Sequence, residues 1–160
     1  MKTVSLCLLT VIAFTVNGSL QKGVDLEKEK AELLEIHKAD RRAHFSTDVE
    51  LLLSRSSDEF ITVSDGKVYR VNRAKSKAMF DDYFRDATYH EWDDLEPPIV
   101  RVSNDASMAW MIVRTKVRRS QKNSTGQDKE ESFVYAGIMT YEKRNGKWRR
   151  VANVTTMQPA

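Results

Sequence analysis

The Asn145-Gly146 dipeptide, which lies between two alternating runs, restricts the fold more than any other short stretch of this chain. Asn-Gly readily supplies the two positive φ angles that a type I′ turn requires, so 132–143 and 147–157 are predicted to pair as antiparallel strands. A two-residue turn places Lys143 opposite Trp148 and Glu142 opposite Arg149, and the same register continued places Met139 opposite Ala152. The predicted core-facing, concave side carries Tyr135, Gly137, Met139, Tyr141, Trp148, Ala152 and Val154, and the outer side carries Thr140, Val151, Asn153 and Thr155.

The remaining patterns predict helices first and strands later. Residues 25–45 lack Gly and Pro and favour a long helix, and 46–55 favour a short one begun by Ser46 or Thr47. Asp65-Gly66 predicts a second hairpin, in which Ser64 lies opposite Lys67 and Thr62 opposite Tyr69. A helix is predicted over 72–86, and strands over 87–92, 99–103 and 108–117. This order indicates an α+β domain whose helices cover one face of a curved antiparallel sheet.

The first 18 residues are predicted to be a signal peptide, and 19–160 a single domain. A short apolar run follows Lys2, and Val16 and Gly18 are spaced like the small residues of a cleavage site. The alternative is a membrane anchor or a buried N-terminal helix. Cys7 lies inside this segment, so the mature chain would have no cysteine for a disulfide. We therefore expect a secreted or periplasmic protein, free of the membrane after cleavage and held by an ordinary hydrophobic core.

The charge balance argues against a nucleic-acid-binding protein. The formal net charge is +3 in a chain with 31% charged residues. The densest basic stretch, 114–122, is offset by nearby acidic residues and resembles the solvated end of a strand.

His37, Asp40 and His44 are the candidate functional residues of the first helix. At ~100° per residue they share a narrow stripe with Leu26 and Leu33, and this stripe is predicted to face inward. Desolvation would raise the pKa of Asp40, so that it could act as a general base with His37 as its partner. A metal site that also uses His90 is disfavoured, because His37 and His44 are separated by ~10 Å along the helix axis. The third interpretation is a set of buried polar groups bonded to one another without chemistry.

Over nearly its whole mature length the chain resembles the nuclear transport factor 2-like superfamily, in particular its SnoaL-like and ketosteroid-isomerase-like branches. The resemblance rests on IHKADRRAHF in the first helix, FITVSDGKVYRV, AMFDDYF, VSNDASMAW and YAGIMTYEKRNGKWRRVANVTT. It implies a cone-shaped α+β barrel with an apolar pocket, usually in a homodimer. None of these motifs is an enzyme fingerprint. Many relatives carry a histidine on the last strand, where this chain has Ala152, Asn153 and Val154.

These observations predict a protein that binds a small apolar or mixed-polarity molecule and dimerises through the outer sheet face. No cofactor or metal is predicted. The alternatives are a lyase or isomerase with Asp40 as general base, and a dimeric scaffold without catalysis. Asp40 and His37 are the predicted catalytic residues, and the predicted ligand-binding residues are His44, Tyr69, His90, Trp92 and Tyr135.

Overall fold

The computed structural model describes residues 23–123 and 125–159, so the predicted signal peptide lies outside the described residues. Three helices occur in this part of the chain: α1 (Leu26–Ser46), α2 (Val49–Leu53) and α3 (Arg73–Phe84). The strands are β1 (Ser56–Ser64), β2 (Lys67–Asn72), β3 (Ala87–Asp94), β4 (Ile99–Val102), β5 (Met108–Lys122), β6 (Asp128–Arg144) and β7 (Lys147–Pro159). No described helix has the length and apolar character needed to cross a membrane.

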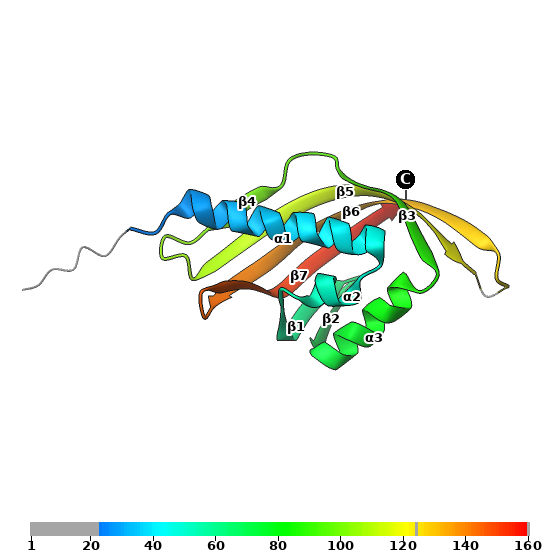
Figure 1. Cartoon of the computed structure of the whole chain (residues 1–160), viewed down its shortest axis with the longest axis horizontal. Coiled ribbons are helices and arrows are strands. Elements are labelled where there is room, and N and C mark those ends of the chain that lie inside the picture. The colour runs from blue at the N-terminus through cyan, green and yellow to red at the C-terminus, as the bar shows by residue number, and fades with distance from the viewer. Residues whose placement is uncertain (1–22, 124, 160) are drawn as a thin grey trace, which may run out of the picture.

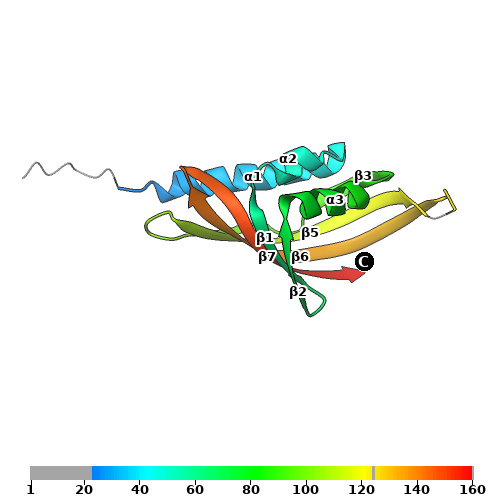
Figure 2. The same ribbon diagram turned by 90° about the horizontal axis from the view of Figure 1, so that it is seen from below.

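The strands form one curved sheet in the order β2-β1-β7-β6-β5-β3, with β4 paired to β5 (Figure 1). All neighbours are antiparallel except β1 and β7, which run parallel, so the sheet is mixed where a purely antiparallel one was expected. The helices lie on one side of the sheet (Figure 2). The predicted α+β fold, a curved sheet wrapped by about three helices, is confirmed.

Short polar side chains set where each helix begins. The carboxylates of Asp25 and Asp48 and the amide of Asn72 accept hydrogen bonds from backbone N–H groups in the first turns of α1, α2 and α3. Thr47 has a left-handed backbone conformation and ends α1. The second helix therefore begins after Asp48, later than the predicted Ser46 or Thr47.

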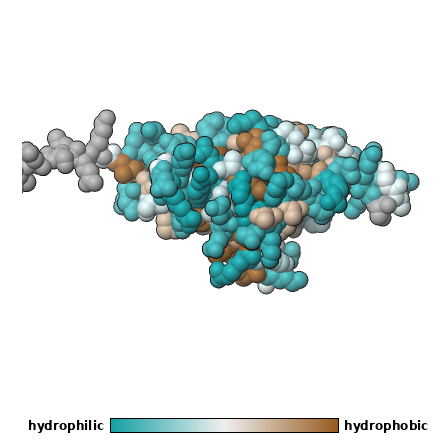
Figure 3. Space-filling view, turned by 60° about the horizontal axis from the view of Figure 1, so that its bottom comes forward, coloured by the Kyte–Doolittle hydropathy of each residue, from teal (hydrophilic) through white to brown (hydrophobic). Residues whose placement is uncertain are grey.

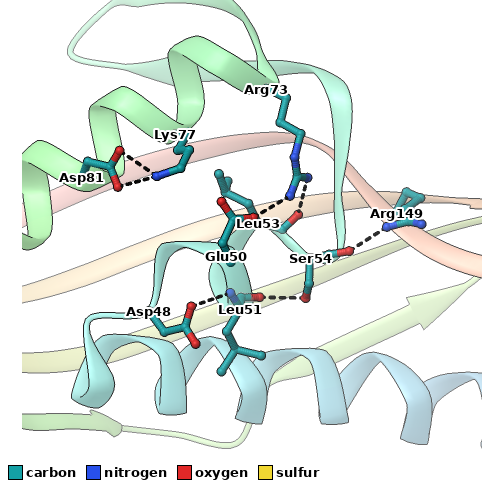
Figure 4. A network of polar contacts seen from close by, with 9 residues as sticks. All are labelled: Asp48, Glu50, Leu51, Leu53, Ser54, Arg73, Lys77, Asp81 and Arg149. Atoms are coloured by element: carbon teal, nitrogen blue, oxygen red, sulfur yellow. Dashed lines mark hydrogen bonds and ion pairs between the residues drawn. The ribbon is translucent and has the colours of Figure 1, made fainter.

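Arginine side chains join α2 to its neighbours (Figure 4). Arg73, at the start of α3, donates to the carbonyl oxygen of Leu53 at 3.1 Å and to Glu50 at 3.2 Å. Arg149 of β7 donates to the carbonyl oxygen of Ser54 at 2.6 Å. These contacts hold α3 and the end of α2 beside the sheet, where they form one wall of the cavity described below.

The predicted register of the last hairpin is correct near the turn and wrong beyond it. Lys143 pairs with Trp148 and Glu142 with Arg149, as expected. Tyr141 then pairs with Arg150 but Thr140 with Ala152, so Val151 is an extra residue on β7. This β-bulge places Met139 opposite Asn153, not opposite Ala152. Asn153 and Thr155 consequently face inward, and Ala152 and Val154 face outward, which reverses the prediction for these four side chains.

The core has two clusters beneath α1. One packs α1 against β4, β5, β6 and β7 through side chains that include Leu33, Met111, Tyr141 and Trp148. The other joins the end of α1 to α2, α3 and β3 through side chains that include Leu52, Phe84, Tyr89 and Trp92. On the face seen in Figure 3 the surface is mostly hydrophilic, with separate hydrophobic areas.

Candidate ligand cavity

The helices and the concave face of the sheet enclose a cavity of about 500 Å³. This volume lies within the range of pockets that hold small organic molecules. The polar side chains among its lining come from α1, from α3 and from the inner face of the sheet. Its lining residues are His37, Asp40, His44, Leu52, Thr62, Met79, Phe80, Asp82, Tyr83, Trp92, Val113, Thr115, Phe133, Tyr135, Met139, Arg150, Asn153, Thr155 and Met157.

A buried ion pair joins α1 to β7 at the polar end of the cavity. An Nη2 hydrogen of Arg150 donates to Oδ2 of Asp40, and both residues are buried. Burial is the largest single effect and disfavours the charge of Arg150, but the Asp40 carboxylate together with Tyr141 and Tyr135 raises the pKa of Arg150. Burial likewise raises the pKa of Asp40, while Arg150 and His37 oppose that rise. Arg150 is thus a permanent cation next to the predicted general base.

His37 belongs to a second series of hydrogen-bonded side chains, which links α1 to β3 and β5. Its Nε2 atom lies 2.8 Å from Oδ2 of Asp94. The other oxygen of Asp94 accepts a hydrogen bond of 3.1 Å from the Thr115 hydroxyl. Because a carboxylate accepts, Nε2 of His37 carries the proton, and the neutral imidazole then has its lone pair on Nδ1. Asp94 therefore fixes both the orientation and the tautomer of His37.

His44 is held neutral among aromatic rings. Its Nδ1 donates to the carbonyl oxygen of Asp40 at 2.7 Å, which leaves Nε2 as an acceptor. The imidazole stacks on Trp92 with a centroid distance of 3.5 Å and meets Phe84 and Tyr89 edge-on. Burial lowers the pKa of His44 to about 4.

Tyr135 forms part of the cavity wall, and Gly137 makes room for it. A Cβ atom at position 137 would lie 2.9 Å from the Tyr135 hydroxyl oxygen and 3.0 Å from the Val154 carbonyl oxygen. The tyrosine ring can lie over the strand only because residue 137 has no side chain. Burial raises the pKa of Tyr135 to about 12, so its hydroxyl stays protonated at neutral pH.

Two methionines mark the part of the cavity lining that reaches solvent. Met79 of α3 is 52% exposed and Met157 of β7 is 62% exposed, and both line the cavity. The cavity therefore runs from a rim with flexible apolar side chains to an inner end with paired charges.

The structure brings together five of the seven predicted site residues. His37, Asp40, His44, Trp92 and Tyr135 all line the cavity. Tyr69 lies on β2, is exposed and does not line it. His90 also lies outside the lining, and its Nε2 contacts the Ser120 hydroxyl at 3.0 Å. His90 is an extra residue in the β3–β5 register, so Tyr89 and Trp92 share the inner face and His90 turns outward.

Arg150 and Asp94 are the charged partners of Asp40 and His37 that the sequence reasoning missed. A signal existed for Arg150, because strand alternation from the buried Trp148 places residue 150 on the same face. Asp94 had no comparable signal, since its contact with His37 is made across 57 positions of the chain. Within the described residues, no group of three or more His, Cys, Asp and Glu side chains is arranged to hold a metal ion.

Comparisons with known proteins identify the fold. No protein-family model and no curated protein sequence matches the chain. Among solved structures, it is similar to a putative Ca/calmodulin-dependent kinase II association domain from Exiguobacterium sibiricum, with 13% identity and a TM-score of 0.65 over 86% of this chain and 99% of that one. It is also similar to an NTF2-like protein with a cystatin-like fold from Novosphingobium aromaticivorans, with 19% identity and a TM-score of 0.60 over 81% and 82% of the two chains.

A third similar structure is a ketosteroid isomerase-like protein from Erwinia carotovora atroseptica, with 15% identity and a TM-score of 0.61 over 83% of this chain and 98% of that one. The chain therefore has the NTF2-like fold that its sequence predicted. At these identities the likeness concerns the fold, and function has to be argued from the cavity itself.

Proposed function

We propose that this protein binds a small, mainly apolar molecule in the cavity between α1, α3 and the concave sheet face. The observation that carries the proposal is the distribution of polarity in the lining. Trp92, Tyr135 and Met139 provide apolar wall, while the Asp40–Arg150 pair gives the inner end a fixed polar anchor. An apolar cavity with a few convergent polar groups is the usual form of a small-molecule site.

Adjacent threonines of β7 provide a matched test. Thr155 lines the cavity opposite Gly137, whereas Thr156 is exposed on the other face of the same strand. Thr155→Phe should fill the cavity and weaken binding of an uncharged apolar fluorescent probe such as N-phenyl-1-naphthylamine by about ten-fold or more, while Thr156→Phe should leave it unchanged. Equal affinity of both variants and the parent protein would refute the cavity as the binding site.

A second candidate function, proton-transfer catalysis of the lyase or isomerase type, is favoured by the His37–Asp94–Thr115 chain. Asp94, itself held by Thr115, fixes the orientation of the His37 imidazole, as a carboxylate does for the catalytic histidine of many enzymes. Asp40, whose pKa is raised by burial, is the alternative base. Either group could remove a proton next to a carbonyl at the inner end of the cavity.

Hydrogen–deuterium exchange at the α-carbon of 2-tetralone in heavy water, followed by proton NMR, tests this activity. If Asp40 is the base, Asp40→Asn should abolish the protein-dependent exchange while circular dichroism shows the fold intact. If His37 is the base, His37→Gln should do so. His90→Gln is the matched control outside the cavity. Exchange that no variant alters would remove both residues as bases.

We also propose that two copies associate through the outer sheet face. Four residues there are aligned across neighbouring strands: Ile99 pairs with Ile112, Ile112 with Ile138, and Ile138 with Val154. Ile99, Ile112 and Val154 are among the exposed large hydrophobic residues, as is Trp110 next to them. An apolar row that crosses four strands, ~15 Å wide at the usual strand spacing, matches itself when a second copy is related by a two-fold axis.

Light scattering after size exclusion tests this association. Ile112→Lys should convert the dimer to a monomer, because it places two charges in the interface. Thr125→Lys, in the exposed turn between β5 and β6, is the control. A monomeric parent protein would refute the dimer.

Secretion or periplasmic export stays a proposal that rests on the sequence of residues 1–18. Mass spectrometry of the protein recovered from culture medium or periplasm should show a mature chain that begins at Ser19. A chain that retains Cys7 would argue for the membrane-anchored alternative.

A further inference from the structure

The inner end of the cavity presents hydrogen-bond acceptors in excess. His44 uses Nδ1 to donate to the Asp40 carbonyl, so its Nε2 has a free lone pair. His37 uses Nε2 to donate to Asp94, and in the tautomer that does so Nδ1 carries a free lone pair. Oδ2 of Asp40 accepts a hydrogen bond from Arg150, and the other carboxylate oxygen, Oδ1, accepts none from the described residues. Three acceptor atoms on one helix thus have no hydrogen-bond partner among the described residues.

These three atoms are also accessible. The buried side-chain atoms that lack a partner in the described part of the chain are the Tyr141 hydroxyl, Nε of Arg150 and Oδ1 of Asn153. His37, Asp40 and His44 have no atom in that set, and all three residues line the cavity. Their free acceptors therefore face a space that a ligand can enter. The Tyr135 hydroxyl both donates and accepts, so it does not remove the excess of acceptors.

The charges at this end disfavour an anion. Asp40 and Asp94 supply two carboxylates, and Arg150 is the cation that pairs with Asp40. A carboxylate or phosphate on the ligand would meet Asp40 and the acceptor nitrogens and would have no unpaired cation to bind. Asp82 adds a further negative charge to the lining. A hydroxyl group suits this environment, because it donates to an acceptor and in turn accepts from the guanidinium.

We propose that the ligand is a neutral molecule with a flat ring system and a hydroxyl group, an alcohol or phenol, which donates its proton to the acceptor set of His37, Asp40 and His44. This assignment rests on the proposed binding function. The ring system is inferred from the aromatic walls, in which Trp92 lies 6.3 Å from Tyr135 between ring centroids.

A set of naphthalenes that differ in one substituent tests the assignment by titration calorimetry at neutral pH. 2-Naphthol can donate, 2-methoxynaphthalene can only accept, 2-naphthoate is an anion, and 2-naphthylmethylammonium is a cation. We expect 2-naphthol to bind at least about ten-fold more tightly than each of the others, as one well-placed hydrogen bond allows. Equal affinities, or tighter binding of the methyl ether, the anion or the cation, would overturn the hydroxyl assignment.

Two variants separate failure of this assignment from failure of the binding function. His44→Phe retains a ring against Trp92 but removes one acceptor, so it should reduce the preference for 2-naphthol over the methyl ether. Thr155→Phe should weaken all four compounds by blocking the cavity. If Thr155→Phe weakens all four while their affinities are equal, the binding function stands and the hydroxyl assignment fails. If none of the four binds, both fail.

Discussion

Acid should destabilise this fold through His44 in particular. The imidazole is 6% exposed and lies against Trp92, Phe84 and Tyr89, so a proton on Nε2 would create a charge with little access to water. The nearby guanidinium groups of Arg150 and Arg119 act in the same direction as burial, and only the hydrogen bond to the Asp40 carbonyl favours protonation.

The magnitude follows from the pKa of His44 in the two states. Its ordinary value of 6.5 falls to about 4 in the folded protein. Between these values the unfolded chain binds a proton that the folded protein does not, so the free energy of unfolding decreases as the pH is lowered. At about 1.4 kcal/mol for each pH unit, His44 should remove about 3 kcal/mol of stability between about pH 6.5 and pH 4.

Urea unfolding of the parent protein and of His44→Phe over this pH range isolates the effect. Other groups contribute to acid unfolding in both proteins, so the difference between the two pH profiles reports on His44. The parent protein should lose about 3 kcal/mol more than His44→Phe as the pH falls to about 4. His90→Phe, which alters a histidine outside the cavity, should follow the parent profile. Parallel profiles of His44→Phe and the parent protein would refute this role of His44.

Three further substitutions probe the lining and the helix that supports it. Gly137→Ala should displace Tyr135, lower the unfolding free energy by about 1–3 kcal/mol and weaken probe binding, as seen in thermal unfolding and titration. Arg150→Met should lower the free energy of unfolding, measured with urea, by about 3–5 kcal/mol, because it leaves the buried Asp40 carboxylate without its partner. Glu29→Gln should lower the free energy of unfolding by about 1–3 kcal/mol. This buried carboxylate accepts hydrogen bonds from a tryptophan indole and a lysine, and these bonds join α1 to the last hairpin. An unchanged urea midpoint would argue against that role.

The sequence predicted local elements and turns better than faces of strands far from the turns. Both two-residue turns fixed the pairs next to them, including Thr62 with Tyr69 and Lys143 with Trp148. The extra residues at Val151 and His90 each shift a register by one position. Such a shift moves every later side chain to the other face, and nothing in the local pattern marks it.

The candidate site was predicted where it depends on one element. The stripe of His37, Asp40 and His44 follows from helical periodicity alone, and all three side chains are buried on the inner face of α1. Their partners could not be predicted in the same way, because Asp94 and Arg150 come from β3 and β7. Periodicity tells which face a residue occupies, whereas hydrogen-bond partners depend on the tertiary arrangement.

Substitution of the Asp40–Arg150 pair can distinguish a structural role of these two residues from a functional one. Two charges removed from water contribute little net stability, and well-packed apolar residues at the same positions often stabilise a protein as much or more. The double variant Asp40→Leu/Arg150→Met should therefore unfold at a urea concentration equal to or above that of the parent protein, whereas Arg150→Met alone should be clearly less stable. If the pair serves recognition, the double variant should also bind 2-naphthol and 2-methoxynaphthalene with equal affinity. A stable double variant that keeps the preference for the hydroxyl would place recognition on the two histidines, and a double variant as unstable as Arg150→Met would show that the pair supports the fold.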